Sequence, residues 1–381
     1  MRFHVVSLPH TQTTKEYLPC AYTQKVVNFC RMMRSLDHEV FLYASEDNDA
    51  PCTELITAIS KEEQRTHLKA NDWRKDFFAI DWNSSLPYWE IMNLRAIEEI
   101  GKRIQQKDFI CLIGGNCQKP IADAFKNHLV VEFGIGYEGT FSNYRVFESY
   151  AWMHYVYGKN GQGDGGYYDA VIPNYFDPAD FPFSAKKDDY FFYIGRLIRR
   201  KGVEVAADVC KRIGKKLIIA GQGAQKVEPG KLICDGFELV GDHIEFVGTV
   251  DVKRRGELMS KAQAVFVPTQ YIGPFEGVHA EAMLCGTPVI TTDWGVFSET
   301  VFDCRTGFRC RTIGEMMWAA MNVKNLAPAA EIREYAKMRF GLDTVRYRYQ
   351  DYFKQLMDLW DKGFYTETYD PRDKREAGCF Q

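Results

Sequence analysis

The sequence predicts an α/β protein with two Rossmann-like domains that face each other across a cleft, and three observations lead to this fold class. Short apolar runs alternate with amphipathic helical segments, which is the pattern of βαβ units around a parallel sheet. This alternation occurs in two blocks, separated by the Gly-, Pro- and Asp-rich segment "KNGQGDGGYYDAVIPNYFDPADFPFSAKK". A chain of 381 residues is also long enough for about two to three domains.

The first block opens with a βαβ unit. "RFHVVSL" predicts a buried strand, residues 22–36 an amphipathic helix and residues 39–43 a second strand. The pattern continues with a helix near 91–105, the strand "DFICLIGG", the helix "PIADAFKN" and the strand "HLVVEFG". We therefore predict that residues 1–170 form an N-terminal domain.

The second block begins at "DDYFFYIGRL" and repeats the alternation. A helix after Gly202 is followed by the strands "KLIIAGQG" and "HIEFVGT", the helix "VKRRGELMSKA", the strand "QAVFVPT", a helix from about Gly277 and the strand "TPVITT". We predict a second domain at 171–345. The tail "AEIREYAKMRFGLDTVRYRYQDYFKQLMDLW" predicts two helices, and residues 366–381 are a polar end.

The composition excludes several classes of protein. Lys plus Arg number 48 and Asp plus Glu number 51, so the net charge of −3 gives no general attraction to nucleic acid. The 11 cysteines lie mostly in apolar runs, which indicates reduced thiols in a cytoplasmic protein. Neither a paired CxxC zinc motif nor a membrane-length apolar run occurs. No "GxGxxG" follows the first strand, so a dehydrogenase is disfavoured.

The first candidate ligand loop is "YIGRLIRRKG", between a strand and a helix. Gly195 and Arg196 follow the strand, and Lys201 precedes the helix. Two cations at such a junction suit a diphosphate, although a solvated loop that merely caps the strand has the same pattern. The loops "LIIAGQG" and "EFVGTV" are weaker signals alone; they contribute Gly221 and the backbone of Val247 and Gly248.

The fourth candidate loop is "PTQYIGPFEGVHAEAMLCGTPVITTDWG", in which a strand runs into a helix and two carboxylates lie five residues apart. Helical spacing places Glu281 one turn beyond Gly277, so that its carboxylate can accept ribose or sugar hydroxyls. An ordinary first-turn glutamate is the plain alternative. The predicted donor residues of this loop are Gly273, Pro274, Phe275, Glu276, Gly277, Val278 and Glu281.

Taken in this order, "GRLIRRKG" and "GPFEGVHAEAMLCGTPVITTDWG" resemble the retaining glycosyltransferases of family 4, which have the GT-B fold. The resemblance covers residues 190–311. It implies transfer of a hexose or pentose from a UDP- or GDP-linked donor with retention, without metal or other cofactor. It also assigns Arg196 and Lys201 to the diphosphate, Glu281 to the ribose, and Gly277 with Val278 to the phosphates. The closing helix, 346–365, is expected to cross back to the first domain.

One position departs from the family pattern. The family's "EPFG" is "GPFE" here, so Gly273 stands where the first glutamate is usual and Glu276 where the glycine is usual. Three interpretations follow: Glu276 takes over the role of the missing glutamate, the donor sugar is unusual and smaller than a hexose, or activity is reduced. We predict that Glu276 points at the sugar or at Arg196 and Lys201, because a carboxylate beside a bare diphosphate is repelled.

The loops of the first block are predicted to bind the acceptor. The predicted acceptor residues are His10, Thr11 and Thr13 after the first strand, and Glu132, Gly134 and Tyr137 around "EFGIGYEG"; His10 is also a candidate for contact with the donor. "SEDND", with Asp47 and Asp49, is interpreted as a surface turn and not as a metal site. The acceptor is a glycan or, as an alternative, a modified base in DNA. Competing functions are a nucleotide-sugar epimerase and a nucleotide-sugar-binding protein without catalysis.

Overall fold

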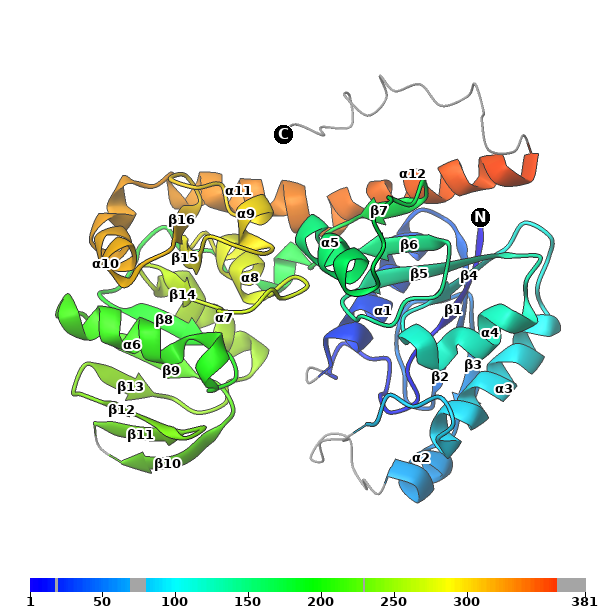
Figure 1. The fold of residues 1–381 in the computed structure, drawn as a ribbon, viewed down its shortest axis with the longest axis horizontal. Helices are drawn as coiled ribbons and strands as arrows, with labels where there is room; N and C mark the ends of the chain where they lie inside the picture. The colour runs from blue at the N-terminus through cyan, green and yellow to red at the C-terminus, as the bar shows by residue number, and fades with distance from the viewer. Residues whose placement is uncertain (18–19, 69–79, 229, 362–381) are drawn as a thin grey trace.

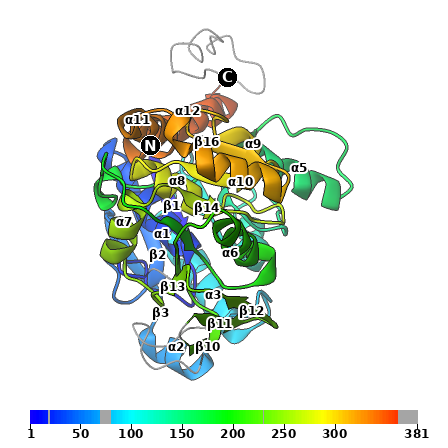
Figure 2. The same cartoon turned by 90° about the vertical axis from the view of Figure 1, so that its left-hand side faces the viewer.

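The computed structural model describes residues 1–17, 20–68, 80–228 and 230–361. They form two α/β units that lie side by side (Figure 1). The helices α11 (Ala329–Phe340) and α12 (Leu342–Asp361) run along one edge of the molecule, and Figures 1 and 2 both show this edge opposite a small antiparallel sheet. The predicted polar end, 366–381, and the last part of the predicted closing helix lie outside the described residues.

The first unit is built on a parallel sheet. In the described residues this sheet has 7 strands in the order β3-β2-β1-β4-β5-β6-β7. Its strands are β1 (Arg2–Val6), β2 (Glu39–Ser45), β3 (Glu54–Ile59), β4 (Phe109–Leu112), β5 (Leu129–Ile135), β6 (Tyr144–Phe147) and β7 (Asp169–Val171). Its helices are α1 (Ala21–Ser35), α2 (Lys61–Leu68), α3 (Pro87–Gly101), α4 (Lys119–Ala124) and α5 (Tyr150–Lys159), with the 3₁₀ turn η1 (Gly115–Gln118).

The second unit has its own parallel sheet, with 6 strands in the order β13-β9-β8-β14-β15-β16 among the described residues. The strands are β8 (Phe191–Ile194), β9 (Leu217–Ala220), β13 (Ile244–Phe246), β14 (Val265–Val267), β15 (Val289–Thr292) and β16 (Gly307–Cys310). The helices are α6 (Val203–Arg212), α7 (Val252–Lys261), α8 (Val278–Leu284), α9 (Phe297–Thr300) and α10 (Ile313–Asn322), and the 3₁₀ turns are η2 (Pro178–Asp180), η3 (Arg199–Lys201) and η4 (Val323–Asn325).

An antiparallel meander that the sequence analysis did not predict lies between β9 and β13. It comprises β10 (Ala224–Glu228), β11 (Lys231–Cys234) and β12 (Phe237–Val240). Its sequence carries a recognisable hairpin signal, because apolar residues alternate on both sides of the Asp235-Gly236 turn. The inward-facing residues join the core that covers one face of the second sheet; they are Leu232, Cys234, Phe237 and Leu239.

The two units are joined by the linker after β7 and by the last helices. Phe176, in the linker, donates its N–H to the carbonyl of Phe340 at 2.8 Å, and Leu342 donates to the carbonyl of Phe176 at 3.0 Å. The chain then returns along the first unit, because α12 buries one face in that unit's core through Val345, Tyr349, Tyr352, Phe353 and Leu356. The predicted domain limits stay predictions; the chain passes from one sheet to the other between β7 and β8.

None of the helices in the described ranges is both long and apolar enough to cross a bilayer.

Candidate donor and acceptor sites

The structure brings the four candidate loops of the second unit into direct contact at the carboxyl ends of its strands. The loop after β8 donates the N–H of Leu197 to the carbonyl of Gln222, in the loop after β9, at 2.8 Å. The loop after β9 donates the N–H of Gly221 to Gly248, after β13, at 2.9 Å. The fourth loop, after β14, donates the N–H of Gln270 to Arg200 at 2.9 Å. Four segments that are far apart in the sequence therefore form one surface.

Two glycines make this close approach possible. Gly221 has φ +139°, and a Cβ at this position would overlap the carbonyl of Gly195. Gly202 has φ +79°, and a Cβ there would overlap the carbonyl of Pro268, which lies just after β14. Each glycine therefore combines a backbone conformation that favours glycine with contact to another loop, and neither can take a side chain without displacing that loop.

Glu276 and Lys201 form an ion pair between the fourth loop and the first. The carboxylate of Glu276 contacts Nζ of Lys201, and both side chains are largely buried. A Cβ built at Gly273 would fall against the Glu276 carboxyl group. The side chain of Glu276 thus fills the space that a residue at 273 would occupy, and it does so from a backbone at φ +61°, which is unusual for a residue other than glycine.

Further cations lie beside this pair. Lys201 Nζ is 5.1 Å from the centre of the Tyr271 ring, and the guanidinium carbon of Arg200 is 4.0 Å from the same centre. Arg196 is exposed. In the part of the chain that the structure describes, its guanidinium has neither an acidic partner nor a hydrogen bond. A cationic surface that includes an unpaired guanidinium suits an anion with several oxygens.

Glu281 lies on α8, and its carboxylate faces α7. Its Oε2 is 3.4 Å from Nη1 of Arg255, and that oxygen is buried without a hydrogen bond in the described structure. One carboxylate oxygen of Glu281 therefore has unused capacity to accept a hydrogen bond.

The other predicted donor residues of the fourth loop differ in exposure. Phe275 is buried, and it packs against His279, with the ring centres 5.1 Å apart. The Pro274, Gly277 and Val278 positions are partly exposed.

The predicted acceptor residues after β1 are buried. Thr13 Oγ1 is 2.7 Å from Ser7 Oγ, and Thr11 Oγ1 accepts from Thr23 Oγ1 at 2.7 Å. His10 is 5% exposed, its Nδ1 makes no hydrogen bond in the described structure, and burial lowers its pKa to about 3. The two threonine hydroxyls therefore brace the loop, whereas His10 is a neutral ring with unused hydrogen-bonding capacity.

Glu132, Gly134 and Tyr137 belong to β5 and the loop after it. The Glu132 carboxylate accepts hydrogen bonds from Tyr137 Oη at 3.1 Å and from the N–H groups of Phe141 and Ser142 at 2.9 and 2.8 Å. Burial raises its pKa to about 7. In this structure the carboxylate is occupied in holding the loop 137–142.

Sequence reasoning missed a buried ion pair in the first unit. Nζ of Lys25, on α1, contacts the carboxylate of Glu148, at the start of α5, and the side chains are only 4% and 3% exposed. Lys25 also donates to the carbonyl of Gly134 at 3.0 Å. A Cβ at Gly136 would contact Glu148 on one side and Pro274 of the second unit on the other. This pair therefore lies next to the fourth loop.

The two units also meet through hydrogen bonds at the start of α5. Ser149 Oγ donates to the carbonyl of Pro274 at 2.7 Å. The carboxylate of Glu299, on α9 of the second unit, accepts from the N–H groups of Tyr150 and Ala151 at 3.0 and 2.9 Å. The first turn of α5 is thus capped by the other unit.

Comparisons with known proteins agree with this architecture. Anabaena HepE, solved in complex with UDP and glucose, superposes with a TM-score of 0.61 over 93% of this chain and 99% of its own, at 14% identity. The chain has the GT-B fold. A glycosyltransferase involved in avilamycin A biosynthesis gives a TM-score of 0.62 over 93% of this chain and 98% of its own, at 18% identity. Sucrose-phosphate synthase from Thermosynechococcus elongatus gives 0.64 over 94% and 99%, at 15% identity.

Sequence comparison reaches only part of the chain. Residues 178–319 match the family model "Glycosyl transferases group 1". Glycogen synthase of Mycobacterium tuberculosis is 33% identical over 178 residues, which are 44% of this chain and 42% of that protein. An uncharacterized glycosyltransferase of Methanocaldococcus jannaschii is 32% identical over 114 residues, 29% of this chain and 28% of its own. The matched segment of this chain thus spans less than half of either relative, and the second unit is similar to group 1 glycosyl transferases.

Proposed function

We propose that this protein transfers a sugar from a nucleotide diphosphate to a hydroxyl acceptor, with retention of configuration at the anomeric carbon. The observation that carries the proposal is the Lys201–Glu276 ion pair, which lies beside the exposed Arg196 where four strand-end loops meet. This surface offers cations for a diphosphate and a carboxylate for hydroxyl groups. A nucleotide sugar carries both kinds of group.

In this proposal Arg196 and Lys201 stabilise the leaving diphosphate. The bond from the anomeric carbon to the diphosphate oxygen breaks, and a bond from that carbon to the acceptor's hydroxyl oxygen forms. The diphosphate gains negative charge as it leaves, and it takes up the proton that the acceptor hydroxyl loses. Cations that are already in place stabilise this charge more in the transition state than in the ground state, which lowers the barrier. The N–H groups of Gly277 and Val278 add hydrogen-bond donors at the start of α8. In this proposal group transfer needs no metal ion, because these cations and N–H groups supply the stabilisation of the leaving group.

Glu276 is proposed to take over the role of the glutamate that Gly273 replaces. Its carboxyl group lies against Gly273, where the Cβ of a side chain at 273 would begin, so the exchange of acid and glycine moves the attachment point by three residues and keeps a carboxylate in this loop. It also pairs with Lys201, which belongs to the first candidate loop. When the donor binds, the sugar hydroxyls of a hexose or pentose would donate to Glu276.

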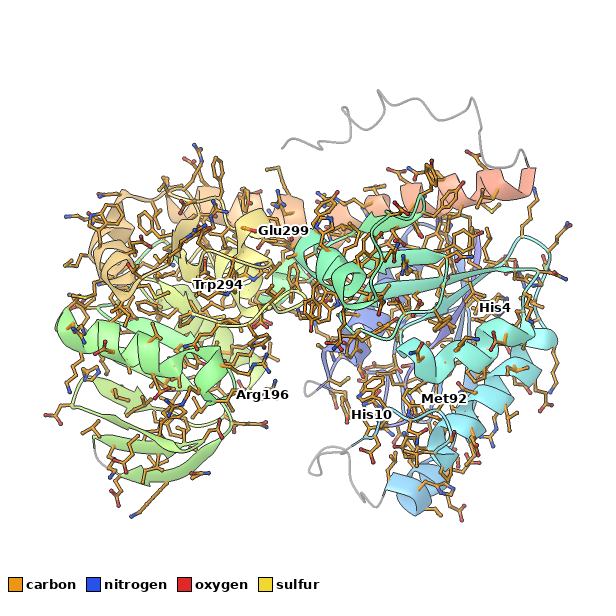
Figure 3. The ribbon with its side chains drawn as sticks, in the orientation of Figure 1. His4, His10, Met92, Arg196, Trp294 and Glu299 are labelled. Carbon is orange, nitrogen blue, oxygen red and sulfur yellow. The ribbon has the colours of Figure 1, made fainter. Side chains whose placement is uncertain are left out.

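The remaining donor contacts follow from the geometry of the loops. Oε2 of Glu281, which makes no hydrogen bond in the described structure, is proposed to accept one from a ribose hydroxyl. The backbone at Gly221, Val247 and Gly248 is proposed to contact the base. Uridine is the first candidate, because HepE, which has the same fold, was solved with UDP-glucose. His10, across the gap in Figure 3, is proposed to contact the acceptor or the donor sugar.

Glu276→Ala tests the proposal. The donor is first chosen as the UDP- or GDP-linked sugar that gives the largest rise in melting temperature, and turnover is then measured as release of UDP or GDP. We expect Glu276→Ala to reduce turnover tenfold or more, a loss of roughly 1.4 kcal/mol. The double variant Gly273→Glu/Glu276→Gly should recover activity relative to Glu276→Ala, because it returns a carboxylate to the same space. Wild-type turnover in Glu276→Ala would contradict the assignment.

Retention is tested separately. The product formed in the first minutes is examined by NMR, and the proposal expects the anomeric configuration of the donor. An inverted product would overturn the retaining mechanism while leaving sugar transfer in place.

A further inference from the structure

A half-exposed tryptophan lies beside the candidate acceptor residues in the first unit. Trp82 is 48% exposed, although its ring contacts three other aromatic side chains. The ring centres of His10 and Trp82 are 6.1 Å apart, those of Tyr22 and Trp82 are also 6.1 Å apart, and those of Trp82 and Trp89 are 5.5 Å apart. One part of the ring is thus held by neighbours while the rest is open to solvent.

The backbone at Trp82 is fastened to α3. Asp81 donates its N–H to Tyr88 Oη at 3.1 Å, and the carbonyl of Asp81 accepts from Tyr88 Oη at 3.0 Å and from Trp89 Nε1 at 3.1 Å. Trp89 itself is fully buried in the core of the first unit. An exposed aromatic ring on a fixed backbone loses little conformational freedom when it binds a ligand.

The ring also lies at the ligand-binding end of the first sheet. His10 follows β1, Tyr22 begins α1 and Tyr137 follows β5, so all three belong to loops or helix starts at the carboxyl ends of parallel strands. Figure 3 places His10 on the side of the first unit that faces Arg196 of the second. The unpaired Nδ1 of His10 is a second sign of a binding site, because a buried polar atom without a partner costs stability.

The geometry points to Trp82 as the stacking platform for the acceptor, and to a saccharide as that acceptor; this inference rests on the proposed function. The apolar face of a sugar ring presents C–H groups to the electron-rich face of an indole, while its hydroxyls remain free for polar neighbours. Nucleic-acid bases also stack on tryptophan, but their phosphates need cations nearby. Here Asp81, next to Trp82 in the sequence, is an exposed acid. Lys25 Nζ lies 4.3 Å from the centre of the Tyr22 ring, but it is paired with Glu148. Lys15 is paired with Asp180 at 2.6 Å.

The experiment compares Trp82→Ala and Trp82→Phe with Trp318→Ala. Trp318 is 54% exposed on α10 of the second unit, so its replacement controls for the loss of an exposed tryptophan. Binding is measured on a printed array of neutral and acidic oligosaccharides with UDP or GDP present, and on a single-stranded DNA oligonucleotide at two salt concentrations. The rise in melting temperature caused by UDP and GDP is recorded for every variant.

We expect the wild-type chain to capture at least one oligosaccharide, Trp82→Ala to weaken that capture tenfold or more, and Trp82→Phe to keep most of it. Trp318→Ala should bind as the wild type does, and the nucleotide-induced shift should be equal in all variants. Equal saccharide binding by Trp82→Ala would overturn the role of Trp82. Failure to bind any saccharide, or preferential binding of DNA that falls steeply with salt, would overturn the saccharide acceptor. If no nucleotide shifts the melting temperature, the proposed function fails, whereas Trp82-dependent saccharide capture would still support the platform.

Discussion

Lys25 and Glu148 form a buried ion pair in the first unit, close to its boundary with the second unit. Both side chains are nearly inaccessible, and Glu148 lies against Gly136, which in turn faces Pro274 of the second unit. Burial raises the pKa of Glu148, while the Lys25 ammonium opposes that rise. The Lys25 ammonium therefore offsets part of the effect that burial has on this carboxyl group.

Lys25→Met should destabilise the protein by about 3–5 kcal/mol, because it leaves Glu148 buried without a compensating charge. The double variant Lys25→Met/Glu148→Gln should regain much of this loss, since it removes the second charge as well. The measurement is the free energy of unfolding from urea titrations monitored by tryptophan fluorescence. A double variant no more stable than Lys25→Met would show that the ion pair is not the source of the effect.

The turn between η3 and α6 is the element that connects the first candidate loop, which carries Arg196 and Lys201, to the segment after the neighbouring strand β14. Gly202 ends η3 and precedes α6, and it packs against the backbone of Pro268 after β14. Gly214 ends the turn after α6 with φ +64°, but open space surrounds the place where its Cβ would be. Both glycines thus have a positive φ, but a Cβ would meet another segment of the chain only at Gly202, where it would overlap Pro268.

Gly202→Ala should therefore destabilise the chain more than Gly214→Ala does. The conformational cost of alanine at positive φ is about 1 kcal/mol and is common to both variants. The additional loss in Gly202→Ala comes from displacing Pro268, and it should also reduce the melting-temperature rise caused by UDP or GDP. Urea unfolding and the nucleotide thermal shift measure the two effects. Equal stability of the two variants would show that the contact with Pro268 is easily relieved.

Elements with strong local signals were predictable from the sequence, and those defined by distant partners were not. α1, predicted at 22–36, spans Ala21–Ser35, because its apolar residues repeat at helical spacing. The meander β10–β12 was missed although Asp235-Gly236 marks its turn, since a helix-rich pattern on both sides favoured continued βαβ units. The contact of Glu276 with Lys201 joins positions 75 residues apart. It was predicted as one of two directions for Glu276, from the repulsion between a carboxylate and a diphosphate and not from neighbouring residues. The exposure of Trp82 depends on how α3 packs, so it was not predicted.

At the scale of the whole molecule, the two units are held by few contacts outside α12 and the linker. Glu299 reaches from α9 to cap α5, and Ser149 donates to Pro274 of the fourth loop. Because the candidate donor surface and Trp82 belong to different units, the proposed sugar transfer would require that the units keep a defined distance. The two hydrogen bonds of Glu299 thus both cap the start of α5 and connect the two units, so losing them would weaken the helix start and the connection together.

Glu299→Ala should widen the distribution of distances between the units. Loss of the cap should cost about 1 kcal/mol, and it removes two of the hydrogen bonds that cross the boundary. Glu315→Ala is the matched control, because Glu315 caps α10 through a box with Thr312 within the second unit. Distances are measured by energy transfer between dyes on the two units, and both variants are also unfolded in urea. We expect similar losses of stability and a broader distance distribution only in Glu299→Ala. A donor that contacts both units should narrow the distance distribution of Glu299→Ala again. An equally broad distribution in Glu315→Ala would contradict the prediction, because general destabilisation, and not loss of the boundary contact, would then set the distance between the units.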